Sequence, residues 1–274
     1  MNIEENMYKH KLEDECLKNM KKAIFCEDTF ASYHENFIEE SLRPDLVGKN
    51  LKVTDKQLPY IHNMVQEMSS VLGIKEPEVY IYEGTNYDVH VQGVNRSWIE
   101  ISAKTVENFS KNELKFLIGS QLAHIKSKHI YWKILMEQCI KAPKLIDNVY
   151  NEGMAGIANE RQILEMGLKV IMYKWSRVAE YSSDACGYLL VGDIEACISA
   201  IKKVIFNNDF ISNNVNLGEY LKQADLLENY NSVMARYSKL DEQIPYGPLR
   251  IKELLRFVSS SKAKEVRKKM RLLN

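Results

Sequence analysis

The chain has 274 residues, enough for one large domain or two small ones. Its 37 lysine and arginine residues are balanced by 37 aspartate and glutamate residues, so no net charge favours nucleic acid or an anionic membrane as a partner. Five scattered cysteines without a CxxC pair fit the reduced thiols of a cytoplasmic protein better than a disulfide framework. No apolar run reaches the roughly 18–20 residues of a membrane-spanning helix, so no transmembrane segment is expected.

The first 48 residues are predicted to form a helical extension. Apolar residues recur there at three- and four-residue spacing, which is typical of one amphipathic helix; they are Leu12, Cys16, Met20, Ala23 and Ile24. The segment Arg43-Pro44-Asp45 and then Gly48 interrupt this pattern and indicate a connector. The predicted division is therefore an extension at 1–48 and a larger domain at 49–274.

The larger domain is predicted to open with a helix and a small sheet. Asp55 can cap a helix that runs to about Leu72, and Gly73 follows where a C-terminal cap is expected. Three β-branched or alternating runs come next, which is typical of short strands; they lie at 79–82, 88–91 and 98–101. Because short loops separate them, they predict a small antiparallel sheet.

A helix occupies the centre of the chain in this prediction. Ser110, with Glu113 three residues later, has the pattern of a capping box and opens a helix that is expected to continue to about Met136. Further helical patterns fill most of the chain towards the C-terminus. The predicted fold class is α+β, mainly α, with the small antiparallel sheet beside the central helix.

The central helix carries the residues of chemical interest, Ser120-Gln121-Leu122-Ala123-His124. They have the outline of His-Glu-x-x-His, in which two histidines one turn apart bind zinc and the glutamate acts as general base. In this chain Ser120 stands at the position of the first histidine, and Gln121 stands at the position of the glutamate. A serine hydroxyl is a poor zinc ligand, and a neutral amide cannot take a proton from water.

Two segments of the chain resemble those of a known family. Residues 116–131, FLIGSQLAHIKSKHIY, are similar to FLIGHELGHILSGHxxY, and residues 175–187, WSRVAEYSSDACG, are similar to WSRxAExSADRAG. Both patterns belong to the HtpX-like and CAAX-prenyl-protease-like zinc metallopeptidases, family forty-eight of the metallopeptidases. The resemblance covers about residues 55–258 and implies a zincin-like metallopeptidase fold.

The resemblance also implies roles for individual positions. His124 and Glu180 match metal ligands, Ser120 stands at the replaced ligand position, and Asp184 matches a carboxylate that orients a ligand histidine. Gln121 stands at the replaced general-base position. Arg250 matches an arginine implicated in stabilising the transition state, and Ile244 replaces a histidine with the same role. An edge strand beside the substrate corresponds to Asp88, Val89, His90 and Val91.

The sequence therefore predicts a catalytically inactive metallopeptidase homologue that needs no cofactor and binds a peptide or protein partner in its cleft. Whether the protein is an enzyme stays open. The alternative is an active zinc-dependent metalloendopeptidase, in which His124, Glu180 and another residue such as His90 hold Zn²⁺. A hydrolase that pairs Ser120 with His124 is disfavoured, because the chain has no GxSxG elbow.

Overall fold

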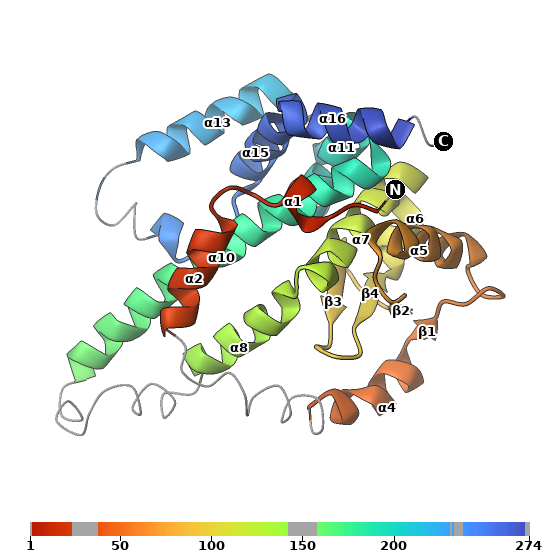
Figure 1. Cartoon of the computed structure of the whole chain (residues 1–274), viewed down its shortest axis with the longest axis horizontal. Coiled ribbons are helices and arrows are strands. Elements are labelled where there is room, and N and C mark those ends of the chain that lie inside the picture. The colour runs from red at the N-terminus through yellow and green to blue at the C-terminus, as the bar shows by residue number, and fades with distance from the viewer. Residues whose placement is uncertain (1, 24–37, 142–157, 231, 233–237, 272–274) are drawn as a thin grey trace.

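The central helix α7 (Lys111–Lys126) lies between a small sheet and the long helix α10 (Ala158–Val191), as Figure 1 shows. This computed structural model describes residues 2–23, 38–141, 158–230, 232 and 238–271. Helices make up most of the described chain and one sheet accompanies them, so the predicted α+β, mainly helical class is confirmed.

The remaining elements follow in chain order. The strands are β1 (Leu51–Lys52), β2 (Glu78–Tyr82), β3 (Val89–Gln92) and β4 (Trp98–Ser102). The helices before α7 are α1 (Glu5–Tyr8), α2 (Glu13–Ala23), α4 (Glu40–Lys49), α5 (Pro59–Leu72) and α6 (Ala103–Asn108). Those after it are α8 (His129–Lys141), α11 (Ile194–Phe206), α12 (Asp209–Asn214), α13 (Leu217–Asn229), α15 (Gly247–Ser259) and α16 (Ser261–Arg271).

The sheet is mixed, so the prediction of a purely antiparallel sheet is wrong in one pairing. Its strand order is β1-β2-β4-β3, in which β2 and β4 are parallel while the other two pairs are antiparallel. The reason is that β3 lies on the far side of β4, and this hairpin returns β4 in the direction of β2. The positions of the three longer strands were predicted correctly, whereas the two residues of β1 are too short for a pattern.

The central helix begins as predicted and ends earlier. The hydroxyl of Ser110 accepts a hydrogen bond from the backbone of Glu113, and the Glu113 carboxylate accepts one from the backbone of Ser110, which completes the capping box. The predicted extension to Met136 is wrong, because Lys128 adopts a left-handed backbone conformation with φ of 54° and α8 starts afresh at His129. This break redirects the chain, so α8 passes close to α10.

Helices α7 and α10 approach each other closely at two glycines. A Cβ atom at Gly187 would lie 2.8 Å from the carbonyl oxygen of Phe116, and one at Gly119 would lie 2.9 Å from a methyl carbon of Leu190. At Gly187 the opposing atom belongs to the backbone, so only glycine fits there without displacing a helix. At Gly119 the leucine methyl could move, but the Cα of Gly187 would still lie 3.3 Å from the added carbon. The small residues therefore set the spacing that brings the candidate site residues of the two helices together.

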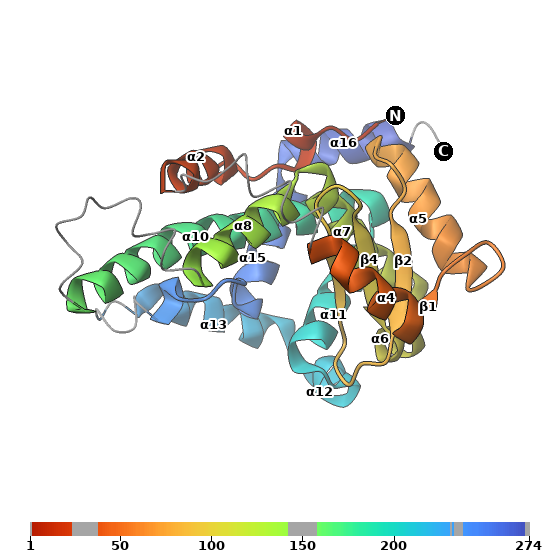
Figure 2. The ribbon, with the colours of Figure 1, turned by 90° about the horizontal axis from the view of Figure 1, so that it is seen from below.

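The N-terminal segment packs on the rest of the molecule in two places. Ile3 and Tyr8 belong to the main core, while Cys16 and Met20 of α2 join a second core between α8 and α10, including Trp175. Figure 2 shows α2 beside α10, with α8 also lying alongside α10. The predicted amphipathic helix is confirmed for α2, although Leu12 precedes the helix and is exposed, and Ile24 lies outside the described residues. The domain boundary at residue 48 stays a prediction.

Two predicted boundaries are wrong. The expected connector at Arg43–Asp45 and Gly48 is helical, because Pro44 lies in the second turn of α4 and removes only one backbone hydrogen bond there. Helix α5 begins at Pro59 rather than after Asp55, since proline suits the first helical position. Its predicted end is confirmed, with Gly73 in the left-handed conformation at φ of 64°.

Candidate functional site

Helices α7 and α10 bring four of the predicted site residues together. Ser120 and His124 lie one turn apart on α7, and Glu180 and Asp184 lie one turn apart on α10; all four are buried. The Ser120 hydroxyl donates to Asp184 Oδ1 at 3.5 Å, and His124 Nε2 lies 3.4 Å from Glu180 Oε1. Because the Ser120 hydroxyl is directed at Asp184, the geometry does not favour a Ser120–His124 hydrolase pair.

The carboxylate of Asp184 is held by Arg250 of α15. Arg250 donates from Nε to Oδ2 at 2.6 Å and from Nη2 to Oδ1 at 2.7 Å, a bidentate contact. Burial raises the pKa of Asp184, and the guanidinium of Arg250 opposes that change. Asp184 thus faces Arg250 and Ser120, whereas the family resemblance implied that it orients a ligand histidine.

Lys133 reaches the site from α8 and was missed by the sequence analysis. Its Nζ donates to Glu180 Oε1 at 2.5 Å. Although burial favours the neutral acid, Lys133 and His124 lower the pKa of Glu180 well below its usual value. The residue was missed because a helix continuing through Lys128 would have carried Lys133 elsewhere, and one lysine among many gives no signal of its own.

A hydrogen-bonded chain leads from His124 to the N-terminal extension. The Nδ1 atoms of His124 and His129 lie 3.0 Å apart, and His129 Nε2 donates to Glu13 Oε1 at 3.0 Å. The other oxygen of Glu13 accepts from the hydroxyl of Ser182. Burial, followed by the nearby Lys133, lowers the pKa of His124 to about 4, so its imidazole is neutral at pH 7. The break after α7 therefore places His129 against His124.

The remaining predicted residues lie around these four. Gln121 is half-buried on α7, and Ile244 is 58% exposed ahead of α15. His90 faces an acidic cluster, with Nδ1 2.6 Å from Asp88 Oδ2 and Nε2 3.8 Å from Glu100 Oε1. Burial lowers the pKa of His90, but Asp88 outweighs it and the net change is upward.

These residues do not fit a zinc ion. A catalytic zinc needs three deprotonated protein ligands, yet Ser120 offers a hydroxyl that is bonded to Asp184, and the ammonium of Lys133 is bonded to Glu180. Across the described ranges, no group of three or more His, Cys, Asp or Glu side chains could hold a metal ion. His90 therefore does not complete a ligand set with His124 and Glu180.

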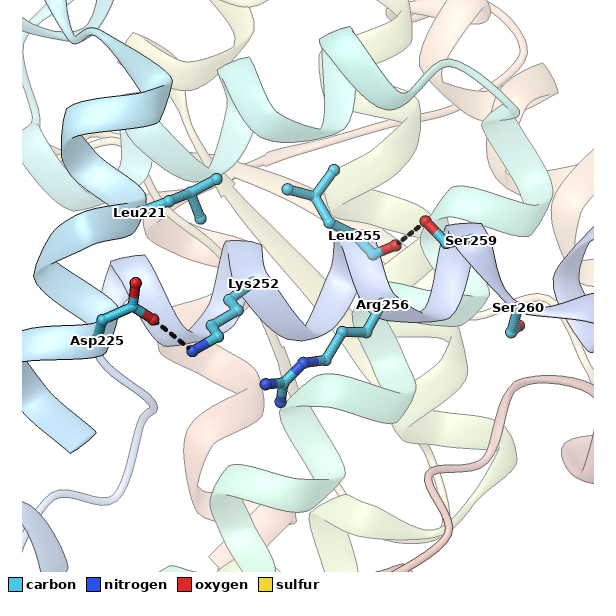
Figure 3. A pocket seen from close by; sticks show the side chains of 7 residues that line it. All are labelled: Leu221, Asp225, Lys252, Leu255, Arg256, Ser259 and Ser260. Atoms are coloured by element: carbon cyan, nitrogen blue, oxygen red, sulfur yellow. Dashed lines mark hydrogen bonds and ion pairs between the residues drawn. The ribbon is translucent and has the colours of Figure 1, made fainter. Parts of the chain in front are cut away.

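A pocket between α13 and α15 lies apart from this site (Figure 3). Its lining consists of Leu221, Asp225, Lys252, Leu255, Arg256, Ser259 and Ser260. Lys252 donates to Asp225 at 2.8 Å and to Glu228 at 2.9 Å, and Arg256 pairs with Glu253. Both basic groups thus have acidic partners, so the pocket is not a prepared site for an anion.

Comparison with known proteins decides the family. The family model described as "Peptidase family M48" matches residues 55–256, close to the range covered by the resemblance. The chain belongs to peptidase family M48. The metallopeptidase-type fold that the sequence implied is therefore that of an M48 domain.

The relatives of this M48 domain are distant. The plastoglobule-localized metallopeptidase 48 of Arabidopsis thaliana is 21% identical over 189 residues, which cover 68% of this chain and 52% of that protein. Protease HtpX homologues of Ralstonia nicotianae and Helicobacter pylori are each 25% identical, over 58% and 76% of their own lengths. The chain thus spans only about half of the first two of these relatives. No solved structure matches the chain significantly.

The family assignment corrects the expectation about partners. That expectation combined a peptide or protein partner with the absence of a nucleic-acid partner and of any transmembrane segment. Membership of a family that includes the HtpX proteases overturns it, because several of these relatives extend well beyond the part that the chain matches. Within the described residues, no helix combines the length and apolar character needed to cross a bilayer.

Proposed function

We propose that this M48 domain is catalytically inactive and binds an extended peptide along the open edge of β3. The observation that carries the proposal is the group at the first ligand position. The hydroxyl of Ser120 donates to a carboxylate, where a peptidase of this kind needs a nitrogen lone pair aimed at a metal. Gln121 adds a second loss, because its amide cannot act as general base.

The edge of the sheet supports the peptide-binding part of the proposal. The backbone N–H of Ser102 donates to the carbonyl of Asp88 at 3.0 Å, and bonded and non-bonded pairs alternate along an antiparallel ladder. The carbonyl of Asp88 and the backbone N–H and C=O groups at positions 90 and 92 therefore point towards β4. The corresponding groups of Val89 and Val91 point to the opposite side of β3, where no further strand pairs with it among the described residues. An extended peptide can pair with these groups without any metal.

Zinc content tests the loss of catalysis. The full chain, purified without chelators and dialysed, is expected to hold far less than one zinc per molecule by elemental analysis and to cleave no casein. The physical reason is that a catalytic zinc needs three protein ligands and only two of them, His124 and Glu180, remain. Near-stoichiometric zinc that resists dialysis would instead support the alternative, an active metalloendopeptidase with a non-standard site, which the protease names of the relatives favour.

Edge pairing is tested with Val91→Pro. Peptides selected from an array of short unstructured sequences are expected to bind the variant about threefold to tenfold more weakly, the cost of one backbone hydrogen bond. Val91→Ala keeps the N–H group and serves as the matched control, with affinity near that of the natural chain. Equal affinity of the proline and alanine variants would exclude this edge as the binding site, and an array without any bound peptide would remove this half of the proposal.

A further inference from the structure

Lys133 places a positive charge beside Glu180, the residue that the family resemblance implies as a metal ligand. Its Nζ lies 2.5 Å from Glu180 Oε1, and its side chain remains 23% exposed while that of Glu180 is 10% exposed. The left-handed conformation of Lys128 ends α7 and directs α8 along α10. The contact thus depends on a backbone turn as well as on the lysine.

The charges at the site are balanced without an ion. Two buried carboxylates, Glu180 and Asp184, face two cations, since Lys133 bonds the first and Arg250 bonds the second. Adding a divalent ion beside Lys133 would leave excess positive charge in a desolvated place, which is strongly unfavourable. Restoring the missing histidine changes the ligand set but leaves this excess charge.

We propose that the ammonium of Lys133 replaces a metal ion as the counter-charge of Glu180, and that it keeps zinc out even when the lost ligand is restored. The inference rests on the proposed function in taking the natural site as free of metal. It assigns a role to a residue outside the two segments that carry the family resemblance, and it makes Lys133 a determinant of metal exclusion separate from Ser120 and Gln121.

The test compares zinc affinities in variants of the full chain, measured by competition with a chromophoric chelator. Ser120→His with Gln121→Glu is expected to bind zinc weakly. Adding Lys133→Met to this pair is expected to tighten binding by on the order of a hundredfold, because a like charge next to the ion is removed. Zinc should also raise the melting temperature of the triple variant.

Two further changes separate charge from size and position. With Lys133→Arg in place of Lys133→Met, the positive charge remains and zinc affinity should stay near that of the double variant. Lys111→Met, at the exposed start of α7, is the matched control and should also leave the double variant unchanged. A double variant that already binds as tightly as the triple, or a folded triple variant that binds no zinc, would overturn the inference.

If the triple variant does not fold, the natural background decides. There Lys133→Met should lower the melting temperature more than Lys133→Arg, because only methionine removes the cation bonded to Glu180 Oε1 and leaves Arg250, 4.0 Å from Oε2, as the nearest guanidinium. Equal losses in the two variants would overturn the inference. Zinc in the purified natural chain would instead refute the proposed function, so the two failures are distinguishable.

Discussion

Replacing Arg250 by methionine is expected to destabilise the protein by about 3–5 kcal/mol, the usual cost of removing one partner from a buried ion pair. The Asp184 side chain is 1% exposed and that of Arg250 is 11% exposed, so water cannot replace the lost guanidinium. Both oxygens of Asp184 would lose a charge-assisted hydrogen bond of 2.6–2.7 Å. Urea unfolding of the natural chain and the variant measures the difference.

Arg256→Met, on the same helix, is the matched control. Arg256 is 57% exposed and pairs with Glu253 at the surface, so its loss should cost no more than about 1 kcal/mol. Adding Asp184→Asn to Arg250→Met should recover part of the stability, because the uncompensated charge is then removed. If Arg250→Met costs no more than Arg256→Met, the pair does not hold α10 to α15 as the geometry indicates.

The second large effect is expected at the crossing of α7 and α10. Gly187→Ala should destabilise the protein by about 1–3 kcal/mol, because the added carbon meets a backbone oxygen at 2.8 Å and a helix must move. The candidate site depends on this spacing, since Ser120 and Asp184 lie close to the crossing. Thermal or urea unfolding measures the change.

The same substitution at Gly167, which also lies on α10, is expected to stabilise the protein instead of destabilising it. A Cβ atom at Gly167 would meet nothing within 4 Å, so Gly167→Ala should stabilise the protein by about 0.5–1 kcal/mol through helix propensity alone. The two variants make the same chemical change in one helix and differ only in their surroundings. Similar effects from both would mean that α7 and α10 are not packed closely at Gly187.

The two proposals about function depend on different atoms. The proposed loss of catalysis rests on Ser120 and Gln121, whose side chains cannot serve as a zinc ligand and a general base. The proposed exclusion of a metal rests also on Lys133, whose ammonium is bonded to Glu180. Changing Ser120 to histidine and Gln121 to glutamate is therefore expected to be insufficient for tight zinc binding. If only a ligand had been lost, the same two changes would restore it.

Local patterns in the sequence determined much of the fold and half of the site. Alternation or β-branched and aromatic composition predicted the three longer strands, and the capping box at Ser110 predicted the start of α7. Spacing of four residues predicted that Glu180 and Asp184 share one face of a helix, as Ser120 and His124 do. These features depend on residues within a turn or a strand of one another, so periodicity reports them directly.

Only the tertiary structure decided which charges meet. Arg250 bonds Asp184 across 66 positions, Lys133 bonds Glu180 across 47, and His129 bonds Glu13 across 116. No periodic pattern relates residues so far apart. The contact of Lys133 also depends on the left-handed conformation of Lys128, which the sequence did not indicate because the residue is not glycine. The sequence by itself thus located the segment that resembles a zinc-binding helix, while only the folded chain showed which cations lie beside Glu180 and Asp184.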